Sequence, residues 1–195
     1  MDKNPIIEFF DRYASQWDDD MVRDEDVIRI ILDNAGIKPG VSVLDVACGT
    51  GVLVPDYLQR QVAYLTCVDI APKMIAHAKQ KYSNTNVRFI CADIEKVHFE
   101  LQFDCAVVYN AFPHFFDPDK LIDKLADDLK PGGLLTIAHG MSRAAIDRHH
   151  QGSAMGVSIG LMHEDELEQR LEPKFDVIVK ISDDRRYQVV GKRKI

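Results

Sequence analysis

The chain has 195 residues, and its 24 Lys and Arg against 31 Asp and Glu give a net charge of −7. Hydrophobic residues make up 46% and charged residues 28%, a globular balance that is too apolar for a disordered protein. The length suits one domain with a sizeable core. Because the charge is negative, binding to nucleic acid through bulk electrostatics is disfavoured, and we expect no nucleic-acid partner.

The sequence shows no sign of a membrane span or of an oxidising compartment. No window offers 18 uninterrupted apolar residues, so we expect neither a transmembrane helix nor a membrane partner. Residues 1–5 lack the charged and apolar regions of a signal peptide. Cys48, Cys67, Cys91 and Cys105 form no CxxC motif, which favours a reduced, cytoplasmic protein.

The hydrophobic pattern predicts alternating helices and strands along the chain. The expected helices cover residues 4–18, 24–35, 53–60, 72–82, 117–129 and 163–171. The expected strands cover residues 41–46, 64–68, 87–91, 103–109, 134–138, 175–181 and 187–192. Residues 140–162 show no clear period and are expected to form a long loop.

The first five expected strands are short apolar runs separated by helices, which is typical of a parallel sheet covered on both faces. No helix separates the last two strands, so one of them must run antiparallel. The pattern therefore predicts one α/β domain over residues 1–195. We expect a doubly wound, Rossmann-like sheet of about seven strands, mostly parallel with one antiparallel strand, whose ligands bind at the carboxyl ends of the strands.

A glycine-rich turn follows the first expected strand, with Asp45 four residues before Gly49 and six before Gly51. Glycines let the backbone approach a ligand closely, and the next helix offers free N–H groups at its start. The dinucleotide fingerprint is excluded, because it needs a third glycine where this chain has Val54. A carboxylate at position 45 suits a ligand with a cationic amine better than a pyrophosphate. A glycine turn without any ligand is the alternative.

The spacing of Asp45, Gly49 and Gly51 resembles D-x-x-x-G-x-G, the first motif of the class I S-adenosylmethionine-dependent methyltransferases. Further matches follow in the family's order: Asp69 after the second strand, Asp93 after the third, residues 103–114 around the fourth, and the turn 129–133 before the fifth. The resemblance covers roughly residues 40–140. It implies a methyltransferase that uses S-adenosylmethionine and acts on a small molecule.

The resemblance also implies roles for individual residues. It assigns Asp45 and the glycine turn to the amino-acid end of the cofactor, Asp69 to the two ribose hydroxyls, and Asp93 with Ile94 to the adenine. For Asp69, a helix cap or a loop role is the alternative. The cofactor-binding residues implied in this way are Tyr13, Trp17, Asp45, Ala47, Cys48, Gly49, Gly51, Asp69, Ile70, Met74, Asp93, Ile94, Asn110 and Ala111.

Residues 10–18 resemble the N-terminal helix that folds over the cofactor pocket in small-molecule members of the family. The tyrosine of that helix, here Tyr13, often meets the cofactor, and Trp17 lies in the same stretch. We therefore expect residues 1–35 to form a cap over the pocket. Plain helix packing is the alternative.

Two histidines are candidate catalytic bases, since His114 follows the fourth expected strand and His139 ends the fifth. Histidine titrates near neutral pH and could remove a proton from a hydroxyl, thiol or amine acceptor. The two could instead shape the pocket by hydrogen bonding or, together with His149 or His150, bind a metal. No tight metal-ligand spacing links these histidines, and we expect no metal.

The long segment 140–162 carries two arginines and two neighbouring histidines, which makes it basic within an acidic chain. A long loop inside a compact domain is usually a functional lid or a disordered segment. We therefore expect a substrate lid in which Arg143, His149 and His150 bind the acceptor, and the local charge suggests an anionic one. A solvated loop is the alternative.

Two other functions remain open at the level of the sequence. The chain could be a sensor or regulatory protein that binds S-adenosylmethionine without transferring its methyl. It could also be an aminopropyl-type transferase built on the same fold. The residues specify neither the acceptor atom nor the oligomeric state.

Overall fold

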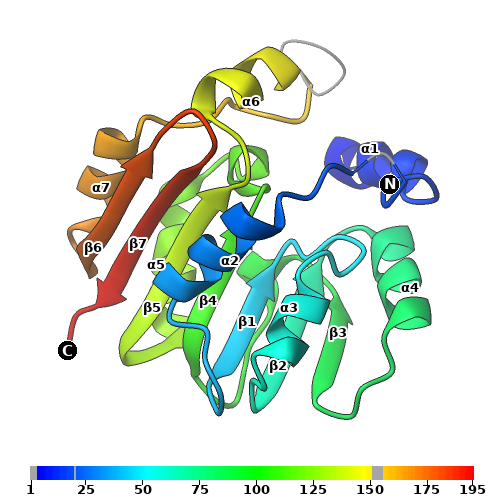
Figure 1. The fold of residues 1–195 in the computed structure, drawn as a ribbon, viewed down its shortest axis with the longest axis horizontal. Helices are drawn as coiled ribbons and strands as arrows, with labels where there is room; N and C mark the ends of the chain where they lie inside the picture. Colours follow the sequence, from blue (N-terminus) through cyan, green and yellow to red (C-terminus); the bar gives the residue numbers. More distant parts are fainter. Residues whose placement is uncertain (1–3, 20, 151–155) are drawn as a thin grey trace.

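A computed structural model describes residues 4–19, 21–150 and 156–195, without the side chains of His149 and His150 (Figure 1). The strands are β1 (Ser42–Val46), β2 (Tyr64–Asp69), β3 (Val87–Cys91), β4 (Phe103–Tyr109), β5 (Leu129–His139), β6 (Phe175–Ser182) and β7 (Tyr187–Arg193). The helices are α1 (Pro5–Tyr13), α2 (Glu25–Asn34), α3 (Val54–Gln59), α4 (Pro72–Lys81), α5 (Pro118–Asp128), α6 (Arg143–His150) and α7 (Glu164–Leu171), with short 3₁₀ helices η1 (Ile94–Lys96) and η2 (Phe112–His114).

The strands form one sheet in the order β3-β2-β1-β4-β5-β7-β6. Strands β1 to β5 run parallel, and β7 runs antiparallel to both of its neighbours. The predicted doubly wound sheet with one antiparallel strand is thus confirmed. The chain winds outward from β1 to β3 and then returns to the centre at β4. Doubly wound sheets bind their ligands at such a reversal, beyond the carboxyl ends of the strands.

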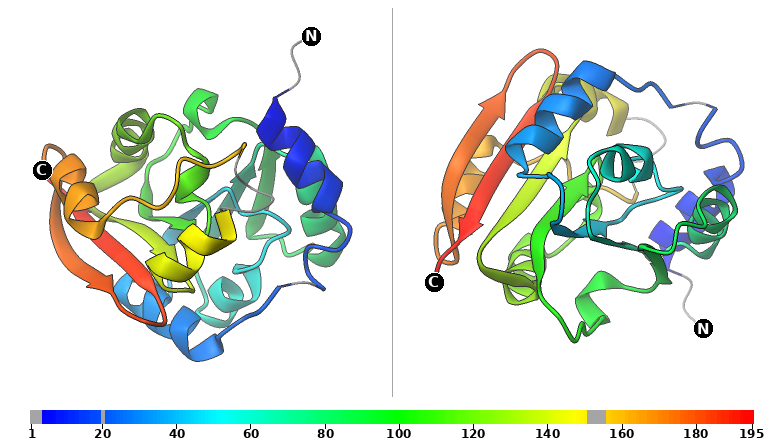
Figure 2. Two further views of the ribbon diagram at one scale, coloured as in Figure 1. Left: turned by 90° about the horizontal axis from the view of Figure 1, so that it is seen from above. Right: turned by 60° about the horizontal axis from the view of Figure 1, so that its bottom comes forward.

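Helices cover both faces of the sheet (Figures 1 and 2). Because side chains alternate along a strand, Val43 and Leu44 of β1 face opposite sides. Val43 packs in a cluster with residues of α2, α3 and α4, whereas Leu44 packs with residues of α5 and α7. The central strands β1 and β4 therefore have both faces buried, which explains their apolar sequences, whereas the edge strand β3 is only partly buried. No helix in the described part of the chain is long and apolar enough to cross a membrane.

Local capping explains where the helices begin. The side chain of Asp117 accepts a hydrogen bond from the Lys120 N–H at 3.1 Å, and Pro118 occupies the first position of α5. Leu121 and Leu125 then follow at helical spacing and are fully buried. The same cap and period allow this helix to be predicted from sequence alone.

Helix α1 is shorter than the prediction of residues 4–18. The Asn4 side chain caps it by accepting from the Ile6 N–H at 2.9 Å, and the helix ends at Tyr13. After it, the chain closes turns in which the Gln16 N–H donates to the Tyr13 carbonyl. Helix α1 buries none of its residues completely.

Helix α2 differs from the expected cap over residues 1–35. Its side chains Val27, Ile28, Ile31 and Leu32 are buried against the sheet, and none of its residues lines the pocket described below. The reason is that its apolar residues spread over a wide stripe, which suits a sheet face better than a pocket rim. Of residues 1–35, the described ones that line the pocket all precede α2.

Residues 140–162 are not a continuous loop, because they contain α6. The Ser142 hydroxyl accepts a hydrogen bond from the Ala145 N–H at 3.3 Å, so a serine cap begins this helix. Residues 151–155 of the expected lid lie outside the described residues. Strand β5 also begins earlier than predicted, since residues 129–133 continue the strand with an irregular register against β4.

Close packing between β6 and β7 leaves no room for a side chain at Gly191, which can be tested by substitution. A Cβ there would lie 2.8 Å from the Cβ of Phe175, which is buried on the neighbouring strand. We expect Gly191→Ala to lower the free energy of unfolding by about 1–3 kcal/mol through overpacking. Urea unfolding monitored by circular dichroism measures this change.

Gly156→Ala is the matched control, because no atom of the described residues lies within 4 Å of a Cβ added there. The control should unfold within about 0.5 kcal/mol of the unaltered protein. Equal unfolding midpoints for the two variants would contradict the packing described for Gly191.

Candidate functional site

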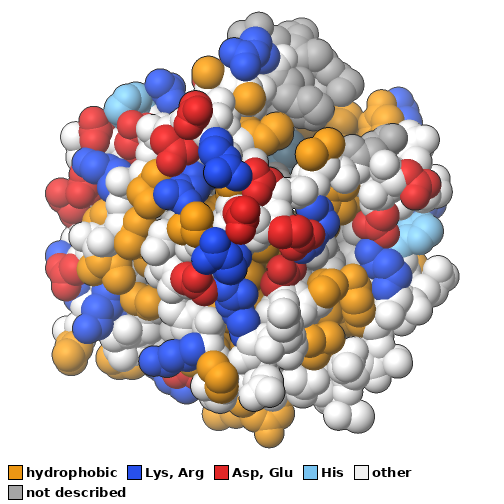
Figure 3. All heavy atoms as spheres, viewed as in Figure 1, with side chains coloured by type: hydrophobic (Ala, Val, Ile, Leu, Met, Phe, Trp, Pro, Cys, Tyr) orange, Lys and Arg blue, Asp and Glu red, His pale blue; other side chains and the backbone are white. Residues whose placement is uncertain are grey.

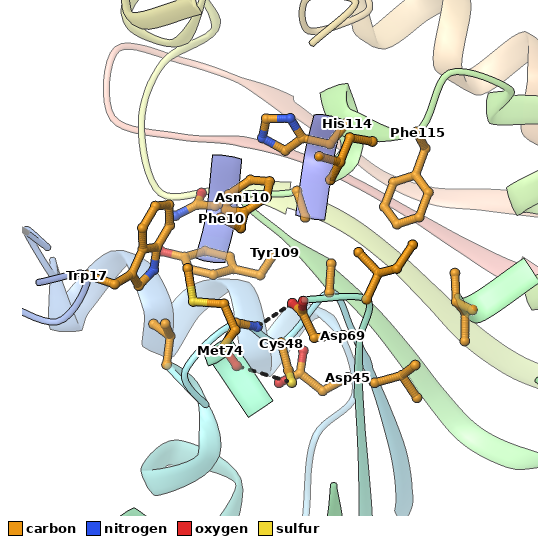
Figure 4. A pocket seen from close by; sticks show the side chains of 18 of the residues that line it. Phe10, Trp17, Asp45, Cys48, Asp69, Met74, Tyr109, Asn110, His114 and Phe115 are labelled. Carbon is orange, nitrogen blue, oxygen red and sulfur yellow. Dashed lines mark hydrogen bonds between the residues drawn. The ribbon is translucent and has the colours of Figure 1, made fainter. Parts of the chain in front are cut away.

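One pocket of about 770 Å³ opens where strands β1 to β5 end (Figure 4). Its walls come from the strand ends, the turns after them, α1 and the turns that follow α1. The predicted residues that line it are Tyr13, Trp17, Asp45, Ala47, Cys48, Gly49, Asp69, Ile70, Met74, Asp93, Ile94, Asn110, Ala111, His114 and His139. Gly51 and Arg143 do not line it, and the side chains of His149 and His150 lie outside the described residues.

The glycine turn has left-handed backbone at two positions, with φ +56° at Gly49 and +82° at Gly51. Gly51 shapes the turn and lies outside the pocket lining, so its contact with the cofactor stays a prediction. A Cβ there would lie 2.9 Å from the Tyr82 ring, which packs beneath the turn. Gly49 reaches the pocket, and its N–H donates to Asp69 Oδ2 at 2.8 Å.

Asp45 is the penultimate residue of β1 and is 2% exposed. Within the described part of the chain, no group donates a hydrogen bond to its carboxylate. Burial raises the pKa of Asp45 well above its ordinary value, and the nearby Asp69 raises it further. A buried carboxylate in this state gains most from a ligand cation, since the cation would compensate for the lost hydration.

Asp69 ends β2 and is held by backbone on both sides. Its Oδ1 accepts from the Ala71 N–H and its Oδ2 from the Gly49 N–H, each at 2.8 Å. Burial raises the pKa of Asp69, while these two hydrogen bonds act to lower it. The local turn role left open by the sequence is thus present together with the pocket position. Each carboxylate oxygen keeps a further lone pair that could accept a ligand hydroxyl.

Asp93 follows β3 and caps η1 by accepting from the Glu95 N–H at 3.1 Å. Its other oxygen forms a salt bridge of 2.9 Å with Lys96. The next residue, Ile94, is 4% exposed and also lines the pocket. A carboxylate beside an apolar side chain suits a flat ring with an exocyclic amine.

Asn110 joins the ends of β4 and β5. Its N–H donates to the Ala138 carbonyl, and its side-chain oxygen accepts from the Gly140 N–H, both at 2.9 Å. Its backbone is left-handed, with φ +55°. The preceding residue, Tyr109, was not predicted as a site residue but lines the pocket, and burial raises its pKa to about 12. Its hydroxyl therefore stays protonated at neutral pH.

The two candidate histidines have different surroundings. The Nδ1 of His114 lies 2.7 Å from the carbonyl oxygen of Val157. A carbonyl only accepts, so Nδ1 donates the hydrogen of this bond. The His114 ring also meets the Phe10 ring edge to face at 5.0 Å between centroids. His139, at the end of β5, is 3% exposed and lies edge-on to Tyr187 at 6.3 Å.

Aromatic and apolar side chains form most of the wall opposite the strand-end carboxylates, and the sequence reasoning missed them. Figure 4 shows His114 and Phe115 across the pocket from Asp45 and Asp69. The missed apolar lining includes Phe9, Phe10, Tyr109, Phe115, Phe116, Met141 and Ile146. The available signals were the apolar stripe of α1 and the aromatic run that follows β4.

Charge in the pocket differs from the expectation of an anionic acceptor. The charged side chains of the described lining are all carboxylates: Asp45, Asp69, Asp93, Glu95 and Asp117. Arg143, expected to bind the acceptor, begins α6 outside this lining and acts instead on Tyr187, where it opposes the pKa rise caused by burial. On the outer face shown in Figure 3, acidic and basic side chains are interspersed.

The lining also bears on the metal alternative. In the described portion of the chain, no group of three or more His, Cys, Asp or Glu side chains is placed to hold a metal ion. The side chains of His149 and His150, which that alternative requires, lie outside this portion.

Comparisons with known proteins agree with this geometry. A family profile described as a methyltransferase domain matches residues 43–133. A malonyl-[acyl-carrier protein] O-methyltransferase of Acetivibrio thermocellus is 32% identical over 141 residues, covering 71% of this chain and 50% of the relative. A ubiquinone biosynthesis O-methyltransferase of Xylella fastidiosa is 36% identical over 103 residues. This match covers 51% of this chain and 42% of the relative. The chain thus spans about half the length of the curated relatives it matches.

Solved structures share the fold. The N-methyltransferase NodS of Bradyrhizobium japonicum, in complex with S-adenosylhomocysteine, superposes with a TM-score of 0.76 at 17% identity over 97% of this chain and 99% of NodS. A second structure is the Haloferax volcanii complex between the Trm112 methyltransferase activator and a methyltransferase. One of its chains superposes with a TM-score of 0.82 at 17% identity, over 95% of this chain and 98% of that chain. Taken with the motif order and the pocket, the match over residues 43–133 identifies a methyltransferase domain with the motifs of the class I S-adenosylmethionine-dependent family, and the solved structures show the same fold.

Proposed function

We propose that this protein transfers the methyl group of S-adenosylmethionine to an uncharged, apolar small molecule. The observation that carries the proposal is the composition of one pocket. Carboxylates from the ends of β1, β2 and the turn after β3 line one side, and aromatic rings with His114 line the other. The first side suits the cofactor, and the second suits an acceptor.

The residues of the first side fit the functional groups of the cofactor. Asp45 is a buried carboxylate that receives no hydrogen bond from the described chain, so an ammonium group would stabilise its charge. Asp69 would accept the ribose hydroxyls, and Asp93 with Ile94 would hold the adenine. When bound, S-adenosylmethionine supplies an electrophilic methyl on its sulfonium.

The second side orients the acceptor and takes its proton. Phe10, Phe115 and Phe116 offer flat apolar contacts, and no Lys or Arg side chain occurs in the described lining. His114, which lines this side, would accept the proton of the attacking hydroxyl, thiol or amine, and its contact with the Val157 carbonyl would orient the ring. Holding the nucleophile in line with the methyl supplies most of the remaining rate acceleration.

The relatives frame the choice of acceptor. One is named for a malonyl group on acyl carrier protein and another for ubiquinone biosynthesis. A malonyl group carries a free carboxylate, which the acidic lining disfavours. An aromatic acceptor suits the rings of this pocket. We therefore expect the acceptor to resemble that of the relative named for ubiquinone biosynthesis more than a malonyl group.

A turnover assay tests the function. The protein is incubated with S-adenosylmethionine and a panel of phenols, aromatic amines and aliphatic carboxylates, and S-adenosylhomocysteine is quantified. We expect product with neutral aromatic acceptors and little with carboxylates. Cofactor binding by calorimetry without product from any acceptor or cell extract would contradict methyl transfer and favour a sensor. Methylthioadenosine as the product would indicate aminopropyl transfer.

Asp45→Asn should weaken binding of S-adenosylmethionine by about 10- to 100-fold, because it removes one charge-assisted contact with the ammonium group. Calorimetry at pH 7.5 measures the affinity. Asp127→Asn, which removes an exposed carboxylate of α5, is the control and should bind as the unaltered protein does. An unchanged affinity in Asp45→Asn would contradict the role of Asp45.

The same variant has a predictable effect on stability. Burial and Asp69 raise the pKa of Asp45 in the folded state, so its ionisation opposes folding at pH values above that pKa. We expect Asp45→Asn to raise the melting temperature of the cofactor-free protein at pH 7.5. The gain should shrink as the pH falls through the raised pKa, because Asp45 then becomes neutral in the unaltered protein as well. A lower melting temperature at every pH would contradict this account.

His114→Ala should lower kcat by about 10²- to 10⁴-fold with an acceptor from the panel, since it removes the proposed base. His139→Ala should cost less, because His139 is buried at the strand end and shapes the pocket. His98→Ala, an exposed histidine outside the pocket, is the control. Added imidazole should partly rescue His114→Ala alone. A wild-type kcat in His114→Ala would contradict the role of His114 as the base.

A further inference from the structure

The first part of the described chain lies across the pocket as a strap, which we define as residues 4–19. It comprises α1 and the turns after it, and α1 packs beside α4 (Figures 1 and 2). Seven of its residues line the pocket, among them the aromatic Phe10, Tyr13 and Trp17. A cofactor beneath these rings would be covered by the strap.

The strap has little apolar packing of its own. None of the residues of α1 is fully buried, and Ala14 is the buried strap residue in a small cluster with Ala71 and Met74. Segments with few buried apolar contacts open at low free-energy cost. Polar bonds to the pocket walls must therefore contribute much of what keeps the strap in place.

Those bonds converge on the elements that form the cofactor side of the pocket. Asp11 Oδ1 accepts from the Lys73 N–H in the first turn of α4 at 2.8 Å. Asp18 Oδ1 accepts from the Thr50 hydroxyl at 2.5 Å, and Asp18 Oδ2 pairs with Lys81 Nζ at 2.6 Å. Beyond the strap, Arg23 pairs with Asp56 of α3 at 2.9 Å.

Asp18 differs from the other contacts because it reaches the glycine turn itself. Thr50 lies between Gly49 and Gly51 and is completely buried. One carboxylate thus joins the end of the strap to the turn and to the last turn of α4. The bond connects protein groups only, so it can form with or without a bound ligand.

We propose that Asp18 is the latch of this strap, and that its bonds to Thr50 and Lys81 break whenever the cofactor enters or the product leaves. The inference rests on the proposed placement of the cofactor in the pocket. It makes Asp18 a positioning residue that acts through the strap and sets the rate of cofactor exchange.

A latch and a simple binding contact differ in their kinetics. If opening of the strap limits exchange, weakening the latch speeds both association and dissociation of the cofactor. If Asp18 only stabilises the bound form of the glycine turn, its loss speeds dissociation and leaves association unchanged. The two rate constants together therefore distinguish the roles.

Stopped-flow fluorescence can measure both rates, because Trp17 is the only tryptophan of the chain and lies in the strap over the pocket. The probe ligand is S-adenosylhomocysteine, displaced by excess S-adenosylmethionine and followed by a radiolabel chase. We expect Asp18→Asn to raise both rate constants about tenfold, the loss of one charge-assisted hydrogen bond. Lys81→Met, which leaves the Thr50 bond in place, should raise both by a smaller factor.

Asp19→Asn is the matched control, because Asp19 is the exposed neighbour of Asp18 in the same turn. It should leave both rate constants unchanged. Unchanged rates in Asp18→Asn, or faster dissociation alone, would overturn the latch. Circular dichroism melting checks that the variants are folded. If the unaltered protein did not bind S-adenosylhomocysteine at all, the proposed function would fail first, and the two failures remain distinguishable.

Discussion

The hydrogen bond between Asp69 and the Gly49 N–H is the contact on which the site depends. It ties the end of β2 to the glycine turn after β1 and places two buried carboxylates, Asp45 and Asp69, side by side. Two acids so placed raise each other's proton affinity, which is costly without a cationic ligand. The described part of the chain therefore buries two neighbouring acidic groups without a positive partner. The cofactor of this family carries positively charged groups that would compensate for them.

The cofactor side of the pocket could be predicted from the sequence for a geometric reason. Asp45, Asp69 and Asp93 each follow an apolar run, and parallel strands separated by helices must all end at the same edge. Residues that are far apart in the sequence but follow such strands are therefore close together at that edge. Gly51 shows the limit of this reasoning, because its motif position is met while the residue lies outside the pocket lining.

The acceptor side could not be predicted in the same way. Phe10 reaches the pocket through the packing of α1, and His114 is oriented by the carbonyl of Val157, 43 residues later in the chain. Arg143 looked available for an anion in a segment read as a loop. The serine cap of α6 instead places it in the first turn of a helix, where Arg143 itself does not line the pocket. Such contacts depend on tertiary packing, which local patterns do not contain.

The central claim is that the strand-end carboxylates position the cofactor and leave its reactive end facing His114. A crystal structure of the protein with S-adenosylhomocysteine tests this claim most directly. The account predicts the ammonium group beside Asp45, both ribose hydroxyls on Asp69 and the sulfur directed toward the aromatic side of the pocket. A ligand whose ribose does not contact Asp69, or whose sulfur faces away from His114, would contradict it.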